Sequence, residues 1–309
     1  MSKTSKSEAY MALSFAMLFW GLSFVASKLA LESFPTFTLI FIRFALASCI
    51  FLAFILIRGF PRFTAKDHMK IFLMAIFEPG LYFVFETIGL QHTSAPKVAL
   101  IIATIPVVVM IFATFLLRER SSAMNLLGMA VSIAGILVLI SGDLKDNWGF
   151  GGSLLGDLYV FGAVISASLY IVSARHLGKK HSAFEFTSMQ IIYAALLYIP
   201  AFIWELPDML WSDISIRSMW ALAYLALFAT VGGFLCYNYA LTKVPATKAA
   251  VFINGIPVVT AISAWFLLGE TLNIIQGLGG IIVLSGVFLA NIYDAGEVSC
   301  KSEPVAIKL

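Results

Sequence analysis

The sequence predicts an all-α polytopic membrane protein with ten transmembrane helices arranged as two inverted five-helix repeats. The first observation is composition, because 61% of the 309 residues are hydrophobic, only 12% are charged, and the mean hydropathy is +0.95. A soluble domain of this length needs far more charge to cover its surface. The second observation is that apolar runs of about 20 residues, long enough to cross a bilayer, recur along the chain. The third is that one of these runs is closely repeated in the second half.

Charged residues, prolines and glycines divide the apolar runs into ten expected spans. These spans cover residues 9–31, 36–57, 69–91, 95–117, 122–142, 155–175, 184–204, 218–241, 246–268 and 272–293. The first span is longer than the apolar core of a secretory signal, which is about 7–15 residues, and no small-residue cleavage pattern follows it. We therefore expect this span to be retained.

The spans group into two halves that are joined by one longer connection. We expect five-helix repeats at 9–142 and 155–293, an extracytoplasmic linker at 143–154, and cytoplasmic tails at 1–8 and 294–309. The linker is one of the longer connections and has five expected spans on either side, which is why we place the boundary between the repeats there.

Orientation follows from lysine and arginine, which gather on the cytoplasmic side of membrane proteins. If the amino terminus is inside, the outer side receives only Lys28, Lys97, Lys145 and Arg217, while Arg43 falls within a span. The remaining basic residues all fall inside. We therefore predict a multi-pass protein of the cytoplasmic membrane with both termini in the cytoplasm, and "predicted outer side" below refers to this orientation.

The repeated run is "SAPKVALIIATIPVVVMIFATFLLRE" at 94–119 and "PATKAAVFINGIPVVTAISAWFLLGE" at 245–270. The two stretches align without gaps at an offset of 151 residues, and more than half of their positions are identical. Five spans per repeat is an odd number, so the second copy must lie upside down in the membrane. Inverted repeats are typical of secondary transporters, whose two halves exchange conformations to open alternately on either side.

Several motifs resemble those of a known family. "FWGLSFVASK" in the first span, "FIRFALA" in the second, and "IPVVV…FLLRE" echoed by "IPVVT…FLLGE" are similar to the drug/metabolite transporter superfamily, and in particular to its ten-helix EamA type. The resemblance covers residues 9–293. It implies a central cavity lined by spans one to four and six to nine, with spans five and ten peripheral. It also implies export of amino acids or other small metabolites.

Glu78 is the most informative charged residue. It lies about midway along span three, directly before Pro79 and Gly80. Proline removes a helix hydrogen bond and glycine loosens the turn, so we expect the backbone to break there and Pro79 to act as a hinge. A carboxylate inside hydrocarbon costs about 2.5–3.5 kcal/mol on insertion scales. Beside a broken helix it can bind a proton or a cationic group; the alternative is a protonated or water-bridged glutamate that fills a polar core.

Glu86 and Arg43 form a second set of charges within the spans. Glu86 lies two turns beyond Glu78 and about 80° round the helix, so both acids could face one cavity. Arg43 in span two is at a similar depth, and an Arg43–Glu86 pair would make both charges tolerable, with Lys97 as a rival partner. Structural pairing is the favoured role of Arg43, and substrate contact is the alternative.

Lys97 and Lys248 begin spans four and nine on opposite sides of the membrane. A cation at a helix amino terminus opposes the macrodipole, so helix stability does not explain either residue. They could reach toward headgroups, capture a substrate carboxylate, or act as gates that pair with an acid when their side is closed. Glu119 and Glu270 end the same spans, where a carboxylate favours the amino terminus of the next helix, and we expect them to be structural.

Prolines and polar side chains complete the candidates. Pro106 and Pro257 are duplicated in mid-span and are expected to be hinges. The aromatic and amide residues of the cavity-forming spans are further candidates for substrate contact, although any single aromatic residue more often packs against lipid or protein. They are Trp20, Tyr82, Tyr170, Tyr237, Asn238 and Asn254. The glycines of spans five and ten suit close helix packing or homodimerisation.

Other classes of protein fit the sequence less well. No G-x-S-x-G, H-E-x-x-H or Cys/His cluster is present, so we predict no catalytic residues, no metal and no cofactor. The net charge of +3 reflects topology, so nucleic acid is not an expected partner. The expected partners are the lipid bilayer and a small-molecule substrate. An inverted repeat without a signature filter fits alternating access better than a channel.

The substrate class stays open at this stage. Two acids in span three favour a cationic or zwitterionic solute, or proton coupling, whereas Arg43 with Lys97 would favour an anion. We favour an amino-acid-like zwitterion exchanged for protons. Export of organic cations or drugs and uncoupled facilitation are the alternatives.

Overall fold

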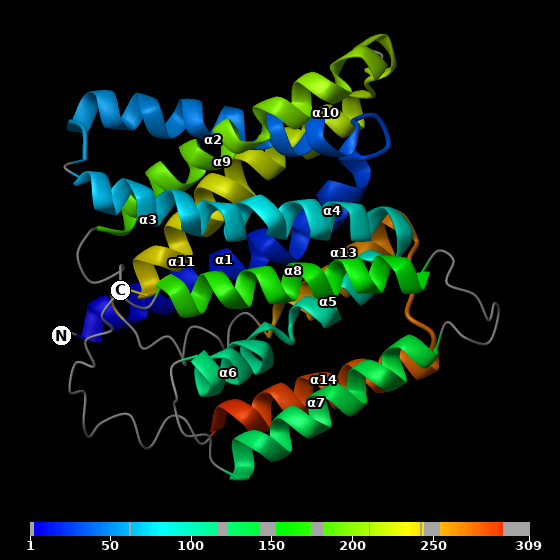
Figure 1. Ribbon diagram of the computed structural model, residues 1–309. Helices are drawn as coiled ribbons and strands as arrows, with labels where there is room; N and C mark the ends of the chain where they lie inside the picture. The colour runs from blue at the N-terminus through cyan, green and yellow to red at the C-terminus, as the bar shows by residue number, and fades with distance from the viewer. Residues whose placement is uncertain are drawn as a thin grey trace.

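The computed structural model describes residues 3–61, 63–116, 123–142, 153–174, 182–209, 211–241, 243 and 254–292. Over these residues the chain is a bundle of helices, and the described part contains no β-strand (Figure 1). Most of the predicted linker and all of the predicted carboxyl-terminal tail lie outside the described residues.

The first repeat supplies seven α-helices and one π segment. They are α1 (Lys3–Ala30), α2 (Thr36–Arg58), α3 (Ala65–Ala75), the π segment η1 (Ile76–Leu81), α4 (Tyr82–His92), α5 (Ala95–Ile102), α6 (Ile105–Leu116) and α7 (Ala123–Ser141). α3, η1 and α4 together form span three, and α5 with α6 forms span four. Helix α1 begins at Lys3 and so extends into the segment predicted to be a tail.

The second repeat follows the same plan. It contains α8 (Ser153–Ala174), α9 (Ala183–Glu205), the short 3-10 turns η2 (Leu206–Asp208) and η3 (Trp211–Asp213), α10 (Ile216–Tyr224), the π segment η4 (Leu225–Gly232), α11 (Gly233–Leu241), α13 (Ile256–Leu268) and α14 (Ile274–Ile292). α10, η4 and α11 form span eight. Each repeat therefore interrupts its third span with a π segment.

The lengths and composition of the helices confirm a polytopic membrane protein. Within the described residues, eight helices are long and apolar enough to cross a membrane, and two shorter apolar helices span Ile256–Leu268 and Ile274–Ala290. Span three starts earlier than predicted, at Ala65, because Thr64 and Asp67 form a capping box there. Ser182 and Glu185 form the same motif at the start of α9.

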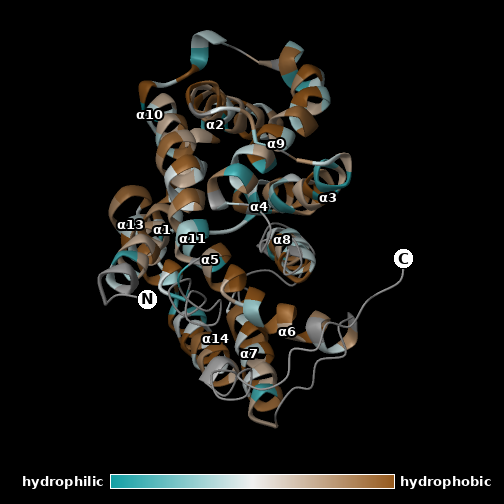
Figure 2. Cartoon of the chain, turned by 90° about the vertical axis from the view of Figure 1, so that its left-hand side faces the viewer, coloured by the Kyte–Doolittle hydropathy of each residue, from teal (hydrophilic) through white to brown (hydrophobic). Residues whose placement is uncertain are grey.

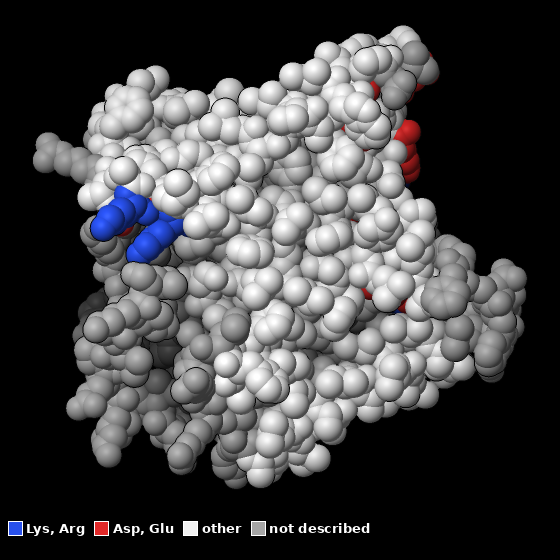
Figure 3. Space-filling model, viewed as in Figure 1, with Lys and Arg blue, Asp and Glu red and all other residues white. Residues whose placement is uncertain are grey.

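The outer surface of the bundle is apolar, as contact with lipid requires. Large hydrophobic side chains such as Ile57, Phe115, Trp220 and Ile274 are exposed, and the helices are predominantly hydrophobic along their length (Figure 2). On the face drawn in Figure 3, lysine and arginine gather at one end and acidic residues at the other, with an uncharged band between them. This distribution is typical of a membrane-spanning protein.

Helices from opposite halves pack against each other through the centre of the molecule. α4 lies along α8, α2 lies along α9, and α1 packs against both α11 and α13. This pairing brings the interrupted third span of each half against helices of the other half.

α7 and α14 form a separate pair beside this core (Figure 1). A Cβ atom on Gly128 would lie 2.3 Å from the backbone nitrogen of Ala290, and one on Gly286 would lie 2.3 Å from that of Ser132. Gly135 and Gly279 have equally close backbone neighbours on the opposite helix. The glycines therefore serve packing between the two repeats inside one chain.

Candidate functional site

Span three breaks where the sequence predicts. Glu78 has φ −139° and ψ 118°, which is not helical, inside the π segment η1 between α3 and α4. Pro79 follows and cannot donate a helix hydrogen bond. Gly80 is needed because a Cβ atom there would lie 2.8 Å from the carbonyl oxygen of Ala75. Pro79 therefore lies at a real interruption of the helix, as expected of a hinge residue.

The carbonyl groups that this break releases are satisfied by side chains of the other half. Ser166 on α8 donates to the Phe77 carbonyl at 2.8 Å, and the amide of Gln190 on α9 donates to the Glu78 carbonyl at 2.7 Å. The hydroxyl of Tyr198, also on α9, donates to Pro79 and Gly80. Irregular backbone is tolerated within a membrane only when it is buried in protein in this way or lines a cavity.

The Glu78 side chain is partly buried and interacts electrostatically with Tyr82, Tyr170 and Tyr237. Among the described residues, no side chain forms a hydrogen bond or ion pair with its carboxylate. The hydroxyl of Tyr170 lies 3.4 Å from Gln190, the residue that holds the backbone of the break. Three tyrosines from spans three, six and eight therefore interact electrostatically with a carboxylate that has no cationic partner among the described residues.

Span eight contains a π segment, η4, at the equivalent position of the second repeat. The carbonyl of Ala229 in η4 accepts a hydrogen bond from the indole of Trp20 at 3.0 Å. The Trp20 ring also packs against Tyr237, with 5.1 Å between ring centroids. Trp20 therefore contacts η4 and also Tyr237, which interacts electrostatically with Glu78.

Arg43 and Glu86 do not form the direct ion pair that depth along the helices suggested. Arg43, 3% exposed, donates from Nε to the hydroxyl of Thr230 at 2.8 Å, and its guanidinium carbon lies 4.4 Å from the Phe83 ring centroid. Glu86, 2% exposed, interacts with Arg43 only electrostatically, and its Oε2 has no hydrogen-bond partner in the described structure. The expectation of direct pairing is wrong because Arg43 is turned toward span eight.

Lys97 is paired with a residue that the sequence did not single out. Its Nζ lies 2.6 Å from the Asp157 carboxylate on α8, and the two side chains are 1% and 3% exposed. Lys97 is therefore not a partner of Glu86. The available signal was position, because Asp157 begins span six on the same predicted outer side as Lys97. Its predicted counterpart Lys248 lies outside the described residues.

A second ion pair joins three elements on the predicted outer side. Lys28 on α1 contacts one oxygen of Glu270 and also donates to the Thr93 carbonyl at 2.9 Å. The other oxygen of Glu270 accepts from the backbone N–H of Ala95 at 2.8 Å. Glu270 therefore supports the amino terminus of α5 rather than that of the helix that follows it.

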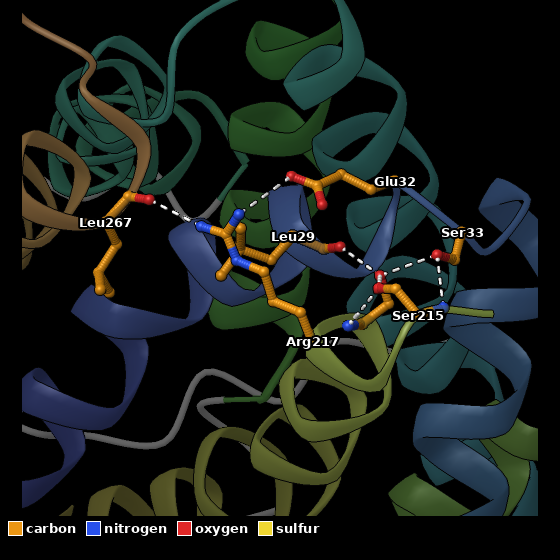
Figure 4. Close-up of polar contacts among 7 residues, drawn as sticks. Leu29, Glu32, Ser33, Ser215, Arg217 and Leu267 are labelled. Carbon is orange, nitrogen blue, oxygen red and sulfur yellow. Dashed lines mark hydrogen bonds and ion pairs between the residues drawn. The ribbon is translucent and has the colours of Figure 1, made fainter.

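Arg217 extends these connections to α10 (Figure 4). Its guanidinium lies 4.0 Å from Glu32 and donates to the Leu267 carbonyl at 2.8 Å. Ser218 donates to the Leu29 carbonyl at 2.8 Å. A depression of about 380 Å³ opens nearby, lined mainly by polar residues, namely Lys28, Gln91, His92, Thr93, Ser94, Lys97, Thr271 and Gln276.

Span four is also interrupted, because α5 ends at Ile102 and α6 begins at Ile105. In span nine, α13 begins at Ile256 directly after a turn at residues 254–255, and residues 244–253 lie outside the described structure. Pro106 and Pro257 occupy the second position of α6 and α13, where a missing N–H is tolerated. The interruption of span four therefore directly precedes α6 and Pro106.

The two candidate amides differ in their surroundings. Asn238 donates to Thr187 on α9 and thus has a packing partner. Asn254 lies in the turn before α13, and its buried Oδ1 has no partner within the described residues. Within the same residues, no three His, Cys, Asp or Glu side chains gather in a way that could hold a metal ion.

A membrane bundle with two inverted halves, interrupted spans and buried charges defines a transporter. The EamA-like transporter family matches residues 7–141 and 154–292, so the chain belongs to this family. This result confirms the resemblance and the two-repeat architecture.

The relatives agree with this assignment. The chain is 27% identical over 283 residues to "Uncharacterized transporter YetK" of Bacillus subtilis (strain 168), covering 91% of this chain and 86% of the relative. An "Uncharacterized transporter" of Archaeoglobus fulgidus is 28% identical over 287 residues, covering 91% and 97%. A crystal structure of another protein has the same fold, with a TM-score of 0.66 at 16% identity over 92% of this chain and 98% of that one.

Proposed function

We propose that this transporter exports small polar metabolites such as amino acids across the cytoplasmic membrane by alternating access, in exchange for protons. The observation that carries the proposal is the carboxylate of Glu78, which lies at the interruption of span three without a cationic partner in the described structure. A charge in hydrocarbon needs a compensating ligand. A proton or a cationic substrate group supplies one, and the two compete for the same carboxylate.

This competition links proton movement to substrate movement. When Glu78 is protonated, it adds no negative charge to the site and does not favour a substrate ammonium there. When the proton leaves, the negative charge of Glu78 favours an ammonium group in the site, and Tyr82, Tyr170 and Tyr237 interact electrostatically with the same carboxylate. Aromatic faces also attract cations, so these rings support the same ligand.

The ion pairs of the predicted outer side supply a gate in this proposal. Lys97–Asp157 joins α5 to α8, and Lys28–Glu270 joins α1 to the end of α13. Opening toward the outside requires these elements to part. In this proposal the outer gate is closed when both ion pairs are formed, and Lys248 is the gate residue of the opposite side.

The test uses purified protein in liposomes with an imposed pH gradient. Internal pH is followed with a dye while amino acids, amines and organic acids are added in turn, and a tracer assay follows the solutes separately. We expect one class of solute to evoke proton movement, and Glu78→Gln to abolish it. Glu32→Gln, which changes a half-exposed carboxylate of the predicted outer side, is the matched control and should transport normally.

Three results would contradict the proposal. Unchanged pH dependence in Glu78→Gln would remove Glu78 from proton exchange. Solute movement without proton movement in the wild type would instead identify an uncoupled facilitator. Proton movement evoked by amines but not by amino acids would favour an exporter of organic cations.

A further inference from the structure

We infer that Arg43 and Glu86 form the binding site for the two opposite charges of a zwitterionic substrate, its carboxylate at Arg43 and its ammonium at Glu86. This inference rests on the proposed function and specifies where the charged groups of the transported solute bind. Glu78 then serves as the neighbouring proton site.

The first observation is that two opposite, buried charges lie near each other without touching. Arg43 and Glu86 are 3% and 2% exposed and interact electrostatically, yet no ion pair joins them in the described structure. In a low dielectric, opposite charges attract strongly, and a buried charge without a partner is costly. Two buried opposite charges that remain apart are therefore expected where a ligand binds between them and pairs with both.

The second observation is that each group keeps unused hydrogen-bonding capacity. The guanidinium forms one hydrogen bond, from Nε to Thr230, and within the described residues no acceptor binds its other N–H groups. On the carboxylate of Glu86, Oε2 has no donor in the same set of residues. The guanidinium carbon lies 4.4 Å from the Phe83 ring centroid, a cation–π contact that uses none of these donors.

The third observation concerns Tyr82, which connects this pair to Glu78. Tyr82 interacts electrostatically with Glu78, Glu86 and Arg43, and its hydroxyl has no hydrogen-bond partner among the described residues. A ligand held between Arg43 and Glu86 would therefore lie beside a hydroxyl that also faces the proton site. Occupation of one site and protonation of the other would then influence each other.

The chemistry of the two groups selects the substrate class. A guanidinium binds a carboxylate through two parallel N–H donors, and a carboxylate accepts hydrogen bonds from an ammonium. A zwitterion satisfies both protein charges and adds no net charge to the site. A solute with only one of the two groups leaves a protein charge unpaired, which a buried site penalises strongly.

The polar depression on the predicted outer side is a weaker candidate for this role. Its two lysines are already neutralised, Lys28 by Glu270 and Lys97 by Asp157. The second repeat offers no duplicate of the site either, because the offset of 151 residues places Ala194 opposite Arg43 and Tyr237 opposite Glu86.

The test compares three ligands on the purified full-length protein. Free amino acids are screened one by one by isothermal titration, and the tightest is compared with its methyl ester, which lacks the carboxylate, and its N-acetyl derivative, which lacks the ammonium. We expect each derivative to bind at least about tenfold more weakly, or about 1.4 kcal/mol.

Two single variants test which residue rejects the methyl ester and which rejects the N-acetyl derivative. Arg43→Gln should bind the free acid and the methyl ester equally and still reject the N-acetyl derivative, whereas Glu86→Gln should show the reverse. Glu32→Gln, which removes a half-exposed carboxylate of the predicted outer side, is the matched control and should keep both preferences. The double variant Arg43→Gln/Glu86→Gln leaves no isolated buried charge, so it keeps the test decisive if a single variant fails to fold, and it should show neither preference.

The outcomes separate this inference from the proposed function. If both single variants weaken all three ligands equally, the two charges are a water-bridged structural pair and the inference is overturned. If amino acids exchange for protons but the variants retain both preferences, the inference fails while the proposed function stands. If no free amino acid binds or moves, the proposed substrate class fails, and this inference with it.

Discussion

Spans three and eight occupy equivalent positions in the two repeats, and both are interrupted by a π segment. The offset of 151 residues pairs Glu78 with Ala229 and Pro79 with Thr230. In each case a side chain of the opposite half satisfies a carbonyl released by the break, Gln190 at Glu78 and Trp20 at Ala229.

The difference between the two breaks lies in their charge. Span three carries Glu78 at its break, and span eight carries the small residue Ala229 and the neutral Thr230, which binds Arg43. The shared interruption supplies two bendable spans, which alternating access requires. The single acid supplies one site for binding. The interruption that both repeats share thus accounts for the conformational change, and the acid that only span three carries accounts for binding.

The largest effect should follow from moving the acid between the breaks. We expect Glu78→Gln/Ala229→Glu to lose proton-linked transport completely, because position 78 no longer carries an acid and the new carboxylate replaces a fully buried alanine. It should also lose about 3–5 kcal/mol of stability, since the added charge is buried without a partner. Liposome pH assays and thermal unfolding in detergent measure the two effects. Restored transport would mean that the two breaks are interchangeable.

Removing the side chains that hold the breaks should have an intermediate effect. Gln190→Leu leaves the Glu78 carbonyl without its donor, and Trp20→Phe does the same for Ala229. We expect each to cost about 1–3 kcal/mol of unfolding free energy, because a buried acceptor is left unsatisfied. Denaturant unfolding in micelles checks this. A cost in only one variant would show that the two breaks are not held alike.

Thr230→Val should have a smaller effect on stability. It removes the hydroxyl that accepts from Arg43 Nε but keeps the shape of the side chain. We expect a loss of about 1.5 kcal/mol, at the lower end for a hydrogen bond to a charged group. Thermal unfolding measures this loss of stability. Thr187→Val, which removes the hydrogen-bond partner of the neutral Asn238, is the comparison and should lose less stability.

Tyr170→Phe should have the smallest effect of these changes. The hydroxyl of Tyr170 lies 3.4 Å from Gln190, which is a long hydrogen bond. We expect a stability loss of about 0.5 kcal/mol, with proton-linked transport retained. A loss of transport without a loss of stability would instead place this hydroxyl in the proton path of Glu78.

The sequence predicts the fold well because composition, span length and the repeat all report on the membrane and its symmetry. The break at Glu78 is also predictable, because Pro79 and Gly80 follow it directly. The π segment in "LFATVG" is not, because this stretch contains no proline. Only its alignment with span three could have indicated it.

Contacts between helices were harder to predict. The depth of Arg43 and Glu86 along their spans suggested a pair, but the rotation of α2 turns Arg43 toward Thr230. The partner of Lys97 was missed because Asp157 is distant in sequence and stands near the predicted linker. The rotation of each helix and its contacts with distant helices depend on the packing of the whole bundle. They cannot be predicted by considering one span of the sequence at a time.

The glycine pair of α7 and α14 has a consequence for the origin of the chain. Gly128 and Gly135 correspond to Gly279 and Gly286 in the second repeat, yet Gly128 packs against Gly286 and Gly135 against Gly279. This crosswise pattern is that of an isologous interface, in which a surface meets a copy of itself about a two-fold axis. A half-length ancestor with this helix could have formed the same contact between two separate molecules. The seam inside the present chain has the geometry of a homodimer interface made permanent by fusion.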